Sequence, residues 1–176
     1  MKENIKQEIV IPEGINVSYI DEVLLVKGPQ GEVKKGISYP TIVILVDNGK
    51  ILLSSENGTK REKRMIGTFN SHIKNMLQGV QEKYVYKLKV CSGHFPMNVS
   101  ISGKDFIVKN FLGEKHPRVV TFPDSVNVKL TGQEVEVNGC SKEEVGQTAG
   151  SIEKMCRINN KDLRIFQDGI YIIEKA

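Results

Sequence analysis

The sequence of 176 residues lacks the features that mark exported and membrane-bound proteins. No stretch approaches the roughly 18 consecutive apolar residues that a membrane-spanning helix needs. The N-terminal segment MKENIKQEIVIPEG carries charged residues where a secretory signal peptide has its apolar core. These absences predict a cytoplasmic protein with no membrane partner.

Cysteine and histidine are scarce, with three residues of each type. Cys91, Cys140 and Cys156 are odd in number and widely spaced, which is typical of reduced thiols in a protein that is not exported. Cys91 and His94 form a close pair, but zinc sites usually combine two such pairs. We therefore expect no metal site.

Motifs that would indicate catalysis or nucleotide binding are also missing. The chain contains neither GxGxxG nor GxxxxGK[ST], the glycine-rich patterns that bind dinucleotides and phosphates. It has no GxSxG nucleophile motif. The most suggestive stretch, KGPQG at residues 27–31, fits a β-turn with proline at the second position and glycine at the fourth. The sequence thus predicts a protein that is not an enzyme and carries no cofactor.

The protein carries a small positive charge that is unevenly distributed. The formal net charge is +4, which is compatible with a polyanionic partner. Basic and amide side chains gather in three clusters: Lys60, Arg61, Lys63 and Arg64; Lys104, Lys109, Lys115, His116 and Arg118; and Arg157, Asn159, Asn160, Lys161 and Arg164. Charge runs often serve only solubility. Three clusters on a chain with 6% aromatic residues favour contact with phosphates over base stacking.

Two parts of the sequence resemble each other. Residues 11–29, IPEGINVSYIDEVLLVKGP, align without a gap with residues 122–140, FPDSVNVKLTGQEVEVNGC, and the match places Gly28 on Gly139. A second match lies downstream in each copy. Such self-similarity indicates a structural unit that occurs twice.

Each copy is predicted to be an antiparallel β-sheet with one packed α-helix, which gives an α+β fold of two tandem duplicated domains. We place the N-terminal domain at residues 1–81 and the C-terminal domain at residues 82–176. Apolar alternation predicts strands near 8–11, 15–19, 23–27, 32–38, 41–46 and 50–55 in the first copy, and near 84–91, 97–103, 106–112, 118–122, 126–130 and 134–138 in the second.

Capping and turn residues predict where these elements begin and end. Thr59 with Glu62, and Ser141 with Glu144, form capping-box patterns that predict the starts of two helices. The sequence Asp47-Asn48-Gly49 predicts a tight hairpin turn. Residues 163–166 and 170–173 are predicted to form a closing hairpin.

Several stretches together resemble one protein family. These are KGPQGEV, NMLQGV at residues 75–80, HFPMNVSISGKDFIVKNFLGEK and NKDLRIFQDGIYII. They occur in the order and at the spacing of the large-subunit ribosomal protein L-six family, in its archaeal and eukaryotic branch. The short chain without a long C-terminal tail favours an archaeal source.

The resemblance implies a structural constituent of the large ribosomal subunit. Such a protein would bind large-subunit rRNA near the sarcin–ricin and translation-factor-binding region, beside neighbouring ribosomal proteins and close to translation GTPase factors. The open alternative is a free-standing protein-interaction module of two β-rich domains.

The resemblance also implies which residues bind RNA, with the C-terminal domain making the main rRNA contacts. Carried onto this chain, the contacts map to the second helix and its flanks: Lys142, Gln147, Ser151, Lys154, Arg157, Lys161 and Arg164. The loop with Lys115, His116 and Arg118 would form a second contact. Gly146, Ala149 and Gly150 would either let the RNA approach the helix backbone or pack the helix on its own sheet.

Overall fold

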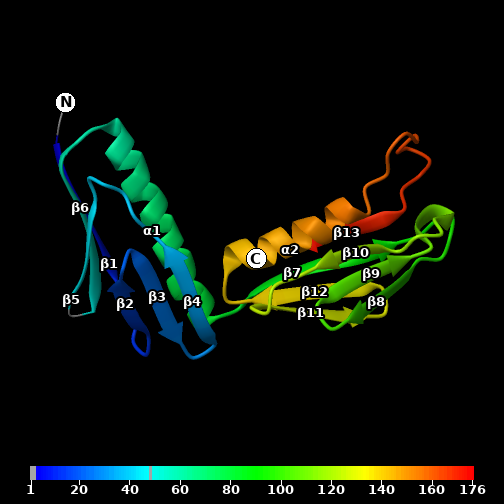
Figure 1. The fold of residues 1–176 in the computed structure, drawn as a ribbon, viewed down its shortest axis with the longest axis horizontal. Coiled ribbons are helices and arrows are strands. Elements are labelled where there is room, and N and C mark those ends of the chain that lie inside the picture. Colours follow the sequence, from blue (N-terminus) through cyan, green and yellow to red (C-terminus); the bar gives the residue numbers. More distant parts are fainter. Residues whose placement is uncertain (1–2, 48) are drawn as a thin grey trace. The chain divides into compact units, whose positions relative to one another are not determined.

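The computed structural model describes residues 3–47 and 49–176, so the predicted turn at Asn48 lies outside the described residues. The chain divides into two compact units, the first ending at Lys83 and the second beginning at Tyr84. Each unit has its own apolar core and combines antiparallel strands with one α-helix (Figure 1). The predicted α+β class and tandem duplication are confirmed. Within the described part of the chain, neither helix has the length and apolar character needed to cross a membrane.

The first unit consists of two three-stranded antiparallel sheets that share one helix. The strand orders are β1-β6-β5 and β2-β3-β4. The elements are β1 (Glu3–Val10), β2 (Asn16–Ile20), β3 (Val23–Gly28), β4 (Gly31–Gly36), β5 (Val43–Asp47), β6 (Lys50–Gly58) and α1 (Lys60–Gln81). Both sheets contribute to a single core, in which Leu24 of β3 and Ile51 of β6 are fully buried. The predicted strands are therefore present, divided between two sheets.

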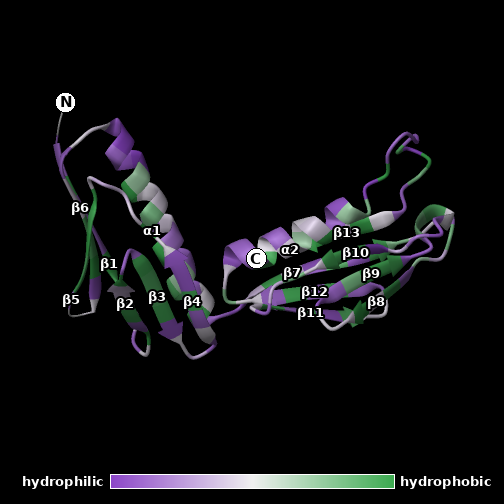
Figure 2. Ribbon diagram, in the orientation of Figure 1, coloured by the Kyte–Doolittle hydropathy of each residue, from purple (hydrophilic) through white to green (hydrophobic). Residues whose placement is uncertain are grey.

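Helix α1 begins where the capping box predicted. Thr59 Oγ1 accepts a hydrogen bond from Arg61 N at 3.3 Å, and the Glu62 carboxylate accepts one from Thr59 N at 2.8 Å. Ile66 and Ile73 lie on the face that packs on the sheets and are 2% and 0% exposed. The first turns of the helix are hydrophilic (Figure 2).

The second unit has a four-stranded sheet, a three-stranded sheet and one helix. The strand orders are β11-β12-β7-β13 and β10-β9-β8. The elements are β7 (Tyr84–Cys91), β8 (Asn98–Ser102), β9 (Asp105–Lys109), the 3₁₀ turn η1 (Phe111–Gly113), β10 (Arg118–Thr121), β11 (Val126–Thr131), β12 (Glu134–Gly139), α2 (Lys142–Met155) and β13 (Gly169–Glu174). Helix α2 covers the four-stranded sheet and buries Val145, Ala149 and Ile152.

The start of α2 differs from the prediction in one hydrogen bond. Ser141 Oγ accepts a bond from Glu144 N at 3.4 Å, which is the first half of the predicted capping box. The Glu144 carboxylate accepts a bond from Ser125 Oγ rather than from the backbone of Ser141. The second half of this box was therefore wrong, because a neighbouring loop supplies a competing donor.

The predicted closing hairpin was also wrong. Residues 163–165 form a turn and no strand, and Asp162 O accepts hydrogen bonds from Ile165 N and Phe166 N. Strand β13 pairs instead with β7, with Ile170 opposite Val90. The partner of β13 is thus a strand distant in sequence, and Ile172 N donates in addition to Glu153 Oε1 at 3.1 Å.

The repeated glycines lie where a strand meets the helix of its unit. A β-carbon at Gly28 would lie 2.8 Å from the Cβ and the backbone oxygen of Val80 in α1. A β-carbon at Gly139 would lie 2.9 Å from Val145 Cγ2 in α2 and from Ser125 O. No side chain fits at either distance, which explains why both copies have glycine here.

The KGPQG stretch forms the predicted turn between β3 and β4. Gly28 pairs with Gly31 across the turn. Gln30 N donates to Val80 O at 3.0 Å and so satisfies one of the carbonyls left free at the C-terminal end of α1. The stretch is thus a structural contact with the helix.

We expect Gly28→Ala to lower the free energy of unfolding by about 1–3 kcal/mol, because the added methyl group would push β3 away from α1. Gly36→Ala is the matched control, since a β-carbon at Gly36 meets no atom within 4 Å. Chemical denaturation followed by circular dichroism measures both changes. Equal and small effects of the two substitutions would contradict a tight contact at Gly28.

Candidate nucleic-acid interface

One face of α2 is polar and open, and the opposite face is buried. Gln147, Ser151 and Lys154 follow one another along the helix at spacings of four and three residues. Gln147 and Lys154 are exposed and Ser151 is half-buried, whereas Ala149 and Ile152 on the opposite face are fully buried. Three of the predicted contact residues therefore lie along one accessible side of the helix.

The small residues of α2 have different surroundings. Ala149 is fully buried, so packing explains its small side chain, and a β-carbon at Gly146 would make an ordinary contact with Tyr86 Oη at 3.5 Å. A β-carbon at Gly150 would meet no atom within 4 Å. Glycine inside a helix costs roughly 1 kcal/mol relative to alanine, and nothing inside this protein requires it at Gly150. The helix backbone is therefore open to close approach at this point.

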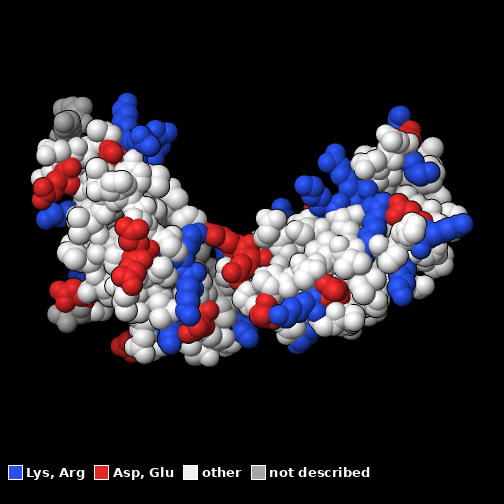
Figure 3. Space-filling model, viewed as in Figure 1, with Lys and Arg blue, Asp and Glu red and all other residues white. Residues whose placement is uncertain are grey.

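Cationic side chains gather around the C-terminal end of α2. Lys154 lies in the last turn, and Arg157, Lys161 and Arg164 follow in the segment beyond it. All four are exposed. Arg164 Nε is 3.2 Å from Asp162 Oδ1, but its side chain remains 91% exposed. In the space-filling view, blue side chains gather over this end of the helix (Figure 3).

Arg118 joins the loop before β10 to the end of α2. Its Nε and Nη2 donate to the Glu114 carboxylate at 2.8 and 2.6 Å, and its Nη1 donates to Met155 O at 2.5 Å. Nη1 is also 3.4 Å from Arg157 O. The guanidinium lies 4.2 Å from the centroid of the Phe111 ring. Arg118 is therefore engaged in contacts within the protein.

The Arg118 contacts place two other predicted residues beside the end of α2. Lys115 and His116 lie in the loop between Glu114 and Arg118, and both are exposed. Because Arg118 binds Glu114 and Met155 O together, the loop is held against the last turn of α2. Its exposed side chains can therefore extend the cationic surface at this end of the helix.

Glu114 and Arg118 each stay charged in their ion pair, and their charges cancel. The hydrogen bond from Arg118 lowers the pKa of Glu114, and the same bond raises the pKa of Arg118. Burial raises the pKa of the neighbouring Cys156 thiol to about 11, so this thiol is uncharged at neutral pH. The exposed positive charge at this end of α2 thus comes mainly from its lysines and from Arg157.

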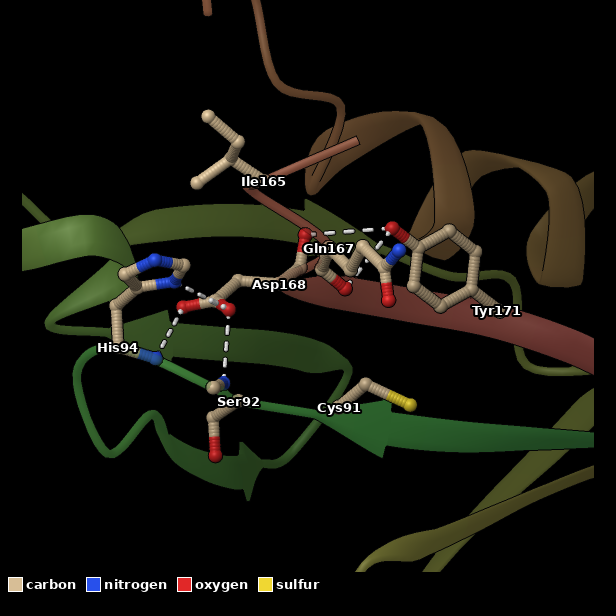
Figure 4. A pocket seen from close by; sticks show the side chains of 8 residues that line it. Cys91, Ser92, His94, Ile165, Gln167, Asp168 and Tyr171 are labelled. Atoms are coloured by element: carbon tan, nitrogen blue, oxygen red, sulfur yellow. Dashed lines mark hydrogen bonds and ion pairs between the residues drawn. The ribbon is translucent and has the colours of Figure 1, made fainter. Parts of the chain in front are cut away.

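A buried carboxylate fixes the chain where it enters β13 (Figure 4). Asp168 accepts hydrogen bonds from Gly93 N at 2.8 Å and His94 N at 3.2 Å, and its Oδ1 is 3.1 Å from His94 Nδ1. Burial raises the pKa of Asp168, but these hydrogen bonds outweigh it and lower the pKa overall. The His94 and Phe166 rings stack at 4.5 Å, and Lys161 Nζ is 4.6 Å from the Phe166 ring. The segment that carries Lys161 is thereby attached to the sheet.

One predicted residue lies apart from the others. Lys142 is the first residue of α2, about 18 Å along the helix axis from Lys154. Its Nζ lies 5.3 Å from the centroid of the Tyr84 ring, and the exposed Glu143 follows it. The structure therefore brings together the predicted residues at the C-terminal end of α2 and leaves Lys142 at the other end.

Sequence reasoning missed the two carboxylates that organise this surface. The spacing of Glu114 and Arg118, four residues apart, was a local signal for their ion pair. Asp168 had no such signal, because its partner Gly93 is 75 residues away in the chain. The sequence had instead predicted Asp168 to be part of a hairpin turn.

Comparison with known proteins identifies relatives over the whole chain. A family model described as "Ribosomal protein L6" matches residues 11–83 and 95–169. The "Large ribosomal subunit protein uL6" of Methanosarcina mazei is 45% identical over 176 residues, covering 100% of both chains. The protein of the same name from Methanococcus vannielii is 44% identical over 172 residues, covering 98% of this chain and 94% of its own length.

We expect Arg118→Ala to lower the free energy of unfolding by about 1.5–3 kcal/mol, since hydrogen bonds to charged groups contribute this much. Lys115→Ala in the same loop is the control, because its exposed side chain should leave the free energy of unfolding within about 0.5 kcal/mol of the parent. Urea denaturation of both variants measures the difference. If Arg118→Ala were as stable as Lys115→Ala, the loop would not depend on the Arg118 contacts.

Proposed function

This chain belongs to the ribosomal protein L6 family and is a protein of the large ribosomal subunit, and we propose that it binds large-subunit rRNA through the C-terminal end of α2. The binding residues are Gln147, Ser151, Lys154, Arg157, Lys161 and Arg164, with Lys115 and His116 from the adjoining loop. Arg118 positions that loop from within the protein. The role of the protein as a whole would be structural, without a catalytic step.

The observation that carries this proposal is the open backbone at Gly150 beside the exposed cations Lys154 and Arg157. Lys154 and Arg157 would neutralise phosphates and release their counterions, which gives salt-dependent affinity. Gly150 lets an RNA strand approach the helix more closely than any side chain would allow. Charge and access thus coincide on one surface.

The polar residues of α2 suit the groove that A-form RNA presents. The major groove of an RNA duplex is too narrow for side chains, whereas the shallow minor groove displays 2′-hydroxyls. Gln147 and Ser151 can donate to and accept from a hydroxyl group. Recognition of this kind reads the shape of the RNA more than its base sequence.

The family resemblance supports a more specific location. On this basis the second unit would lie at the sarcin–ricin and translation-factor-binding region, close to the translation GTPases and to neighbouring ribosomal proteins. The protein would then be located on ribosomes in the cytoplasm. Exposed Val43 and Leu45 on the edge strand β5 favour a protein neighbour for the first unit. A free-standing interaction module, the alternative function, would not remain attached to large subunits through a high-salt wash.

We expect Gly150→Ala to stabilise the free protein by about 0.4–1 kcal/mol, because alanine favours the helix and no atom obstructs its methyl group. The same substitution should weaken rRNA binding about tenfold, or roughly 1.4 kcal/mol, since the methyl group would keep the RNA from the backbone. Thermal unfolding and filter binding to an archaeal large-subunit rRNA transcript measure the two effects.

Gly146→Ala is the matched control for Gly150→Ala. Both glycines lie in α2, but the methyl group at Gly146 would face Tyr86 of the same protein. It should leave rRNA affinity unchanged. If the two variants bound rRNA equally well, close approach at Gly150 would be excluded.

We expect Lys154→Ala combined with Arg157→Ala to reduce the slope of log affinity against log salt by about 1–2, because two phosphate contacts are lost. The control is Lys89→Ala with Lys129→Ala, which removes two exposed lysines of the same unit that lie outside the proposed surface. Filter binding across a salt series measures the slopes, and footprinting of the rRNA should show protection at the sarcin–ricin region. Protection elsewhere would reject the location, and equal slopes would reject the binding surface.

A further inference from the structure

The start of α1 has a concentration of positive charge that the binding surface on the second unit does not use. Lys60, Arg61, Lys63 and Arg64 lie within the first five residues of the helix and are exposed, and Lys74 is exposed nearly three turns after Arg64. Blue side chains gather at this end of α1 in the space-filling view (Figure 3). The arrangement is local to the first unit and does not depend on the second.

These cations have little compensation from acidic groups. Helix α1 contains one acidic residue, Glu62, and its carboxylate turns back to accept hydrogen bonds from Thr59 N and Oγ1. No ion pair joins Lys60, Lys63 or Lys74 to a carboxylate among the residues that the structure describes. By contrast, Lys27 and Lys34 of the same unit both pair with Glu32, at 3.3 and 3.4 Å.

The stability of the helix does not explain this charge. The N-terminal end of a helix carries a partial positive charge, so cations in the first turn are unfavourable there. α1 has Lys60 and Lys63 in this position and no basic residue in its last turn, the reverse of the favourable arrangement. The cost would be offset by a partner that brings negative charge.

The chemistry of the surrounding surface favours RNA over an acidic protein. Between Arg64 and Lys74 the exposed residues of α1 are small or polar, including Thr68 and Ser71. Lysine, arginine, serine and threonine are the side chains that contact phosphates and sugars. The core of a protein interface is more apolar. Among the described residues of the first unit, the exposed large apolar side chains all lie on strands and none lies on α1: Val10, Ile20, Val23, Val43 and Leu45.

We propose that the exposed face of α1 is a second RNA-binding surface, which contacts the phosphate backbone through Lys60, Lys63, Arg64 and Lys74. This inference rests on the proposed rRNA-binding function and extends it to the first unit. The contacts are electrostatic and carry no base specificity. The protein would then contact RNA through the helix of each unit.

The test uses the full chain and an archaeal large-subunit rRNA transcript in a salt series. Lys63→Gln with Arg64→Gln should weaken binding about tenfold at 0.1 M salt and lower the salt slope by about 1–2. Because the substitutions remove unfavourable charge from the helix start, the melting temperature should stay equal or rise. The control is Lys27→Gln with Lys34→Gln, which removes two charges that Glu32 already pairs. It should leave the affinity and the slope unchanged.

The outcomes distinguish this surface from the one on α2. The Lys154→Ala and Arg157→Ala protein is measured in the same series. If the Lys154→Ala and Arg157→Ala protein binds more weakly and the α1 variant matches its control, the surface on α1 is disproved and the surface on α2 remains. If neither variant changes binding, the proposed function itself fails. Loss of binding to polyglutamate by the α1 variant, with unchanged rRNA binding, would assign the face to an acidic protein and overturn the proposal.

Discussion

The close contact between each helix and its sheets is the constraint on which the rest of the molecule depends. Gly28 lets β3 reach Val80 in α1, and Gly139 lets β12 reach Val145 in α2. Because this contact occupies one face of each helix, the opposite face remains accessible to solvent. The duplication therefore gave the protein two accessible helix faces of similar construction. Their surface side chains set them apart, with cations at the start of α1 and around the end of α2.

Much of the fold could be predicted from the sequence, because its signals are local. Apolar alternation located the strands, and Thr59 with Glu62 marked the start of α1. The failures came where a partner distant in sequence decides the structure. Residues 163–166 have the composition of a strand, but β13 bonds to β7 and leaves Ile165 64% exposed in a turn. Glu144 likewise turns to Ser125, which a local capping pattern does not reveal.

For the proposed binding surface, the sequence indicated the types of side chain but not their surroundings. The family motifs pointed to α2 and its flanks, but residue type alone does not tell which cations are available. Arg118 is neutralised by Glu114 and holds a loop, whereas the exposed Lys154 is directed to solvent. Likewise, glycine at 146 and 150 looks equivalent in the sequence. Only the neighbours in space show that a β-carbon at Gly146 would contact Tyr86 and that one at Gly150 would contact nothing within 4 Å.

The segment between α2 and β13 is held in place at both of its ends by hydrogen bonds. Arg118 binds the backbone of Met155 where the segment begins, and Asp168 binds Gly93 where it ends. A flexible segment would lose conformational entropy when it became ordered on a partner. Here that loss has already occurred during folding, so the contact that we propose for Lys161 would be made from a preorganised loop. The two carboxylates, Glu114 and Asp168, would thus favour association without touching the partner.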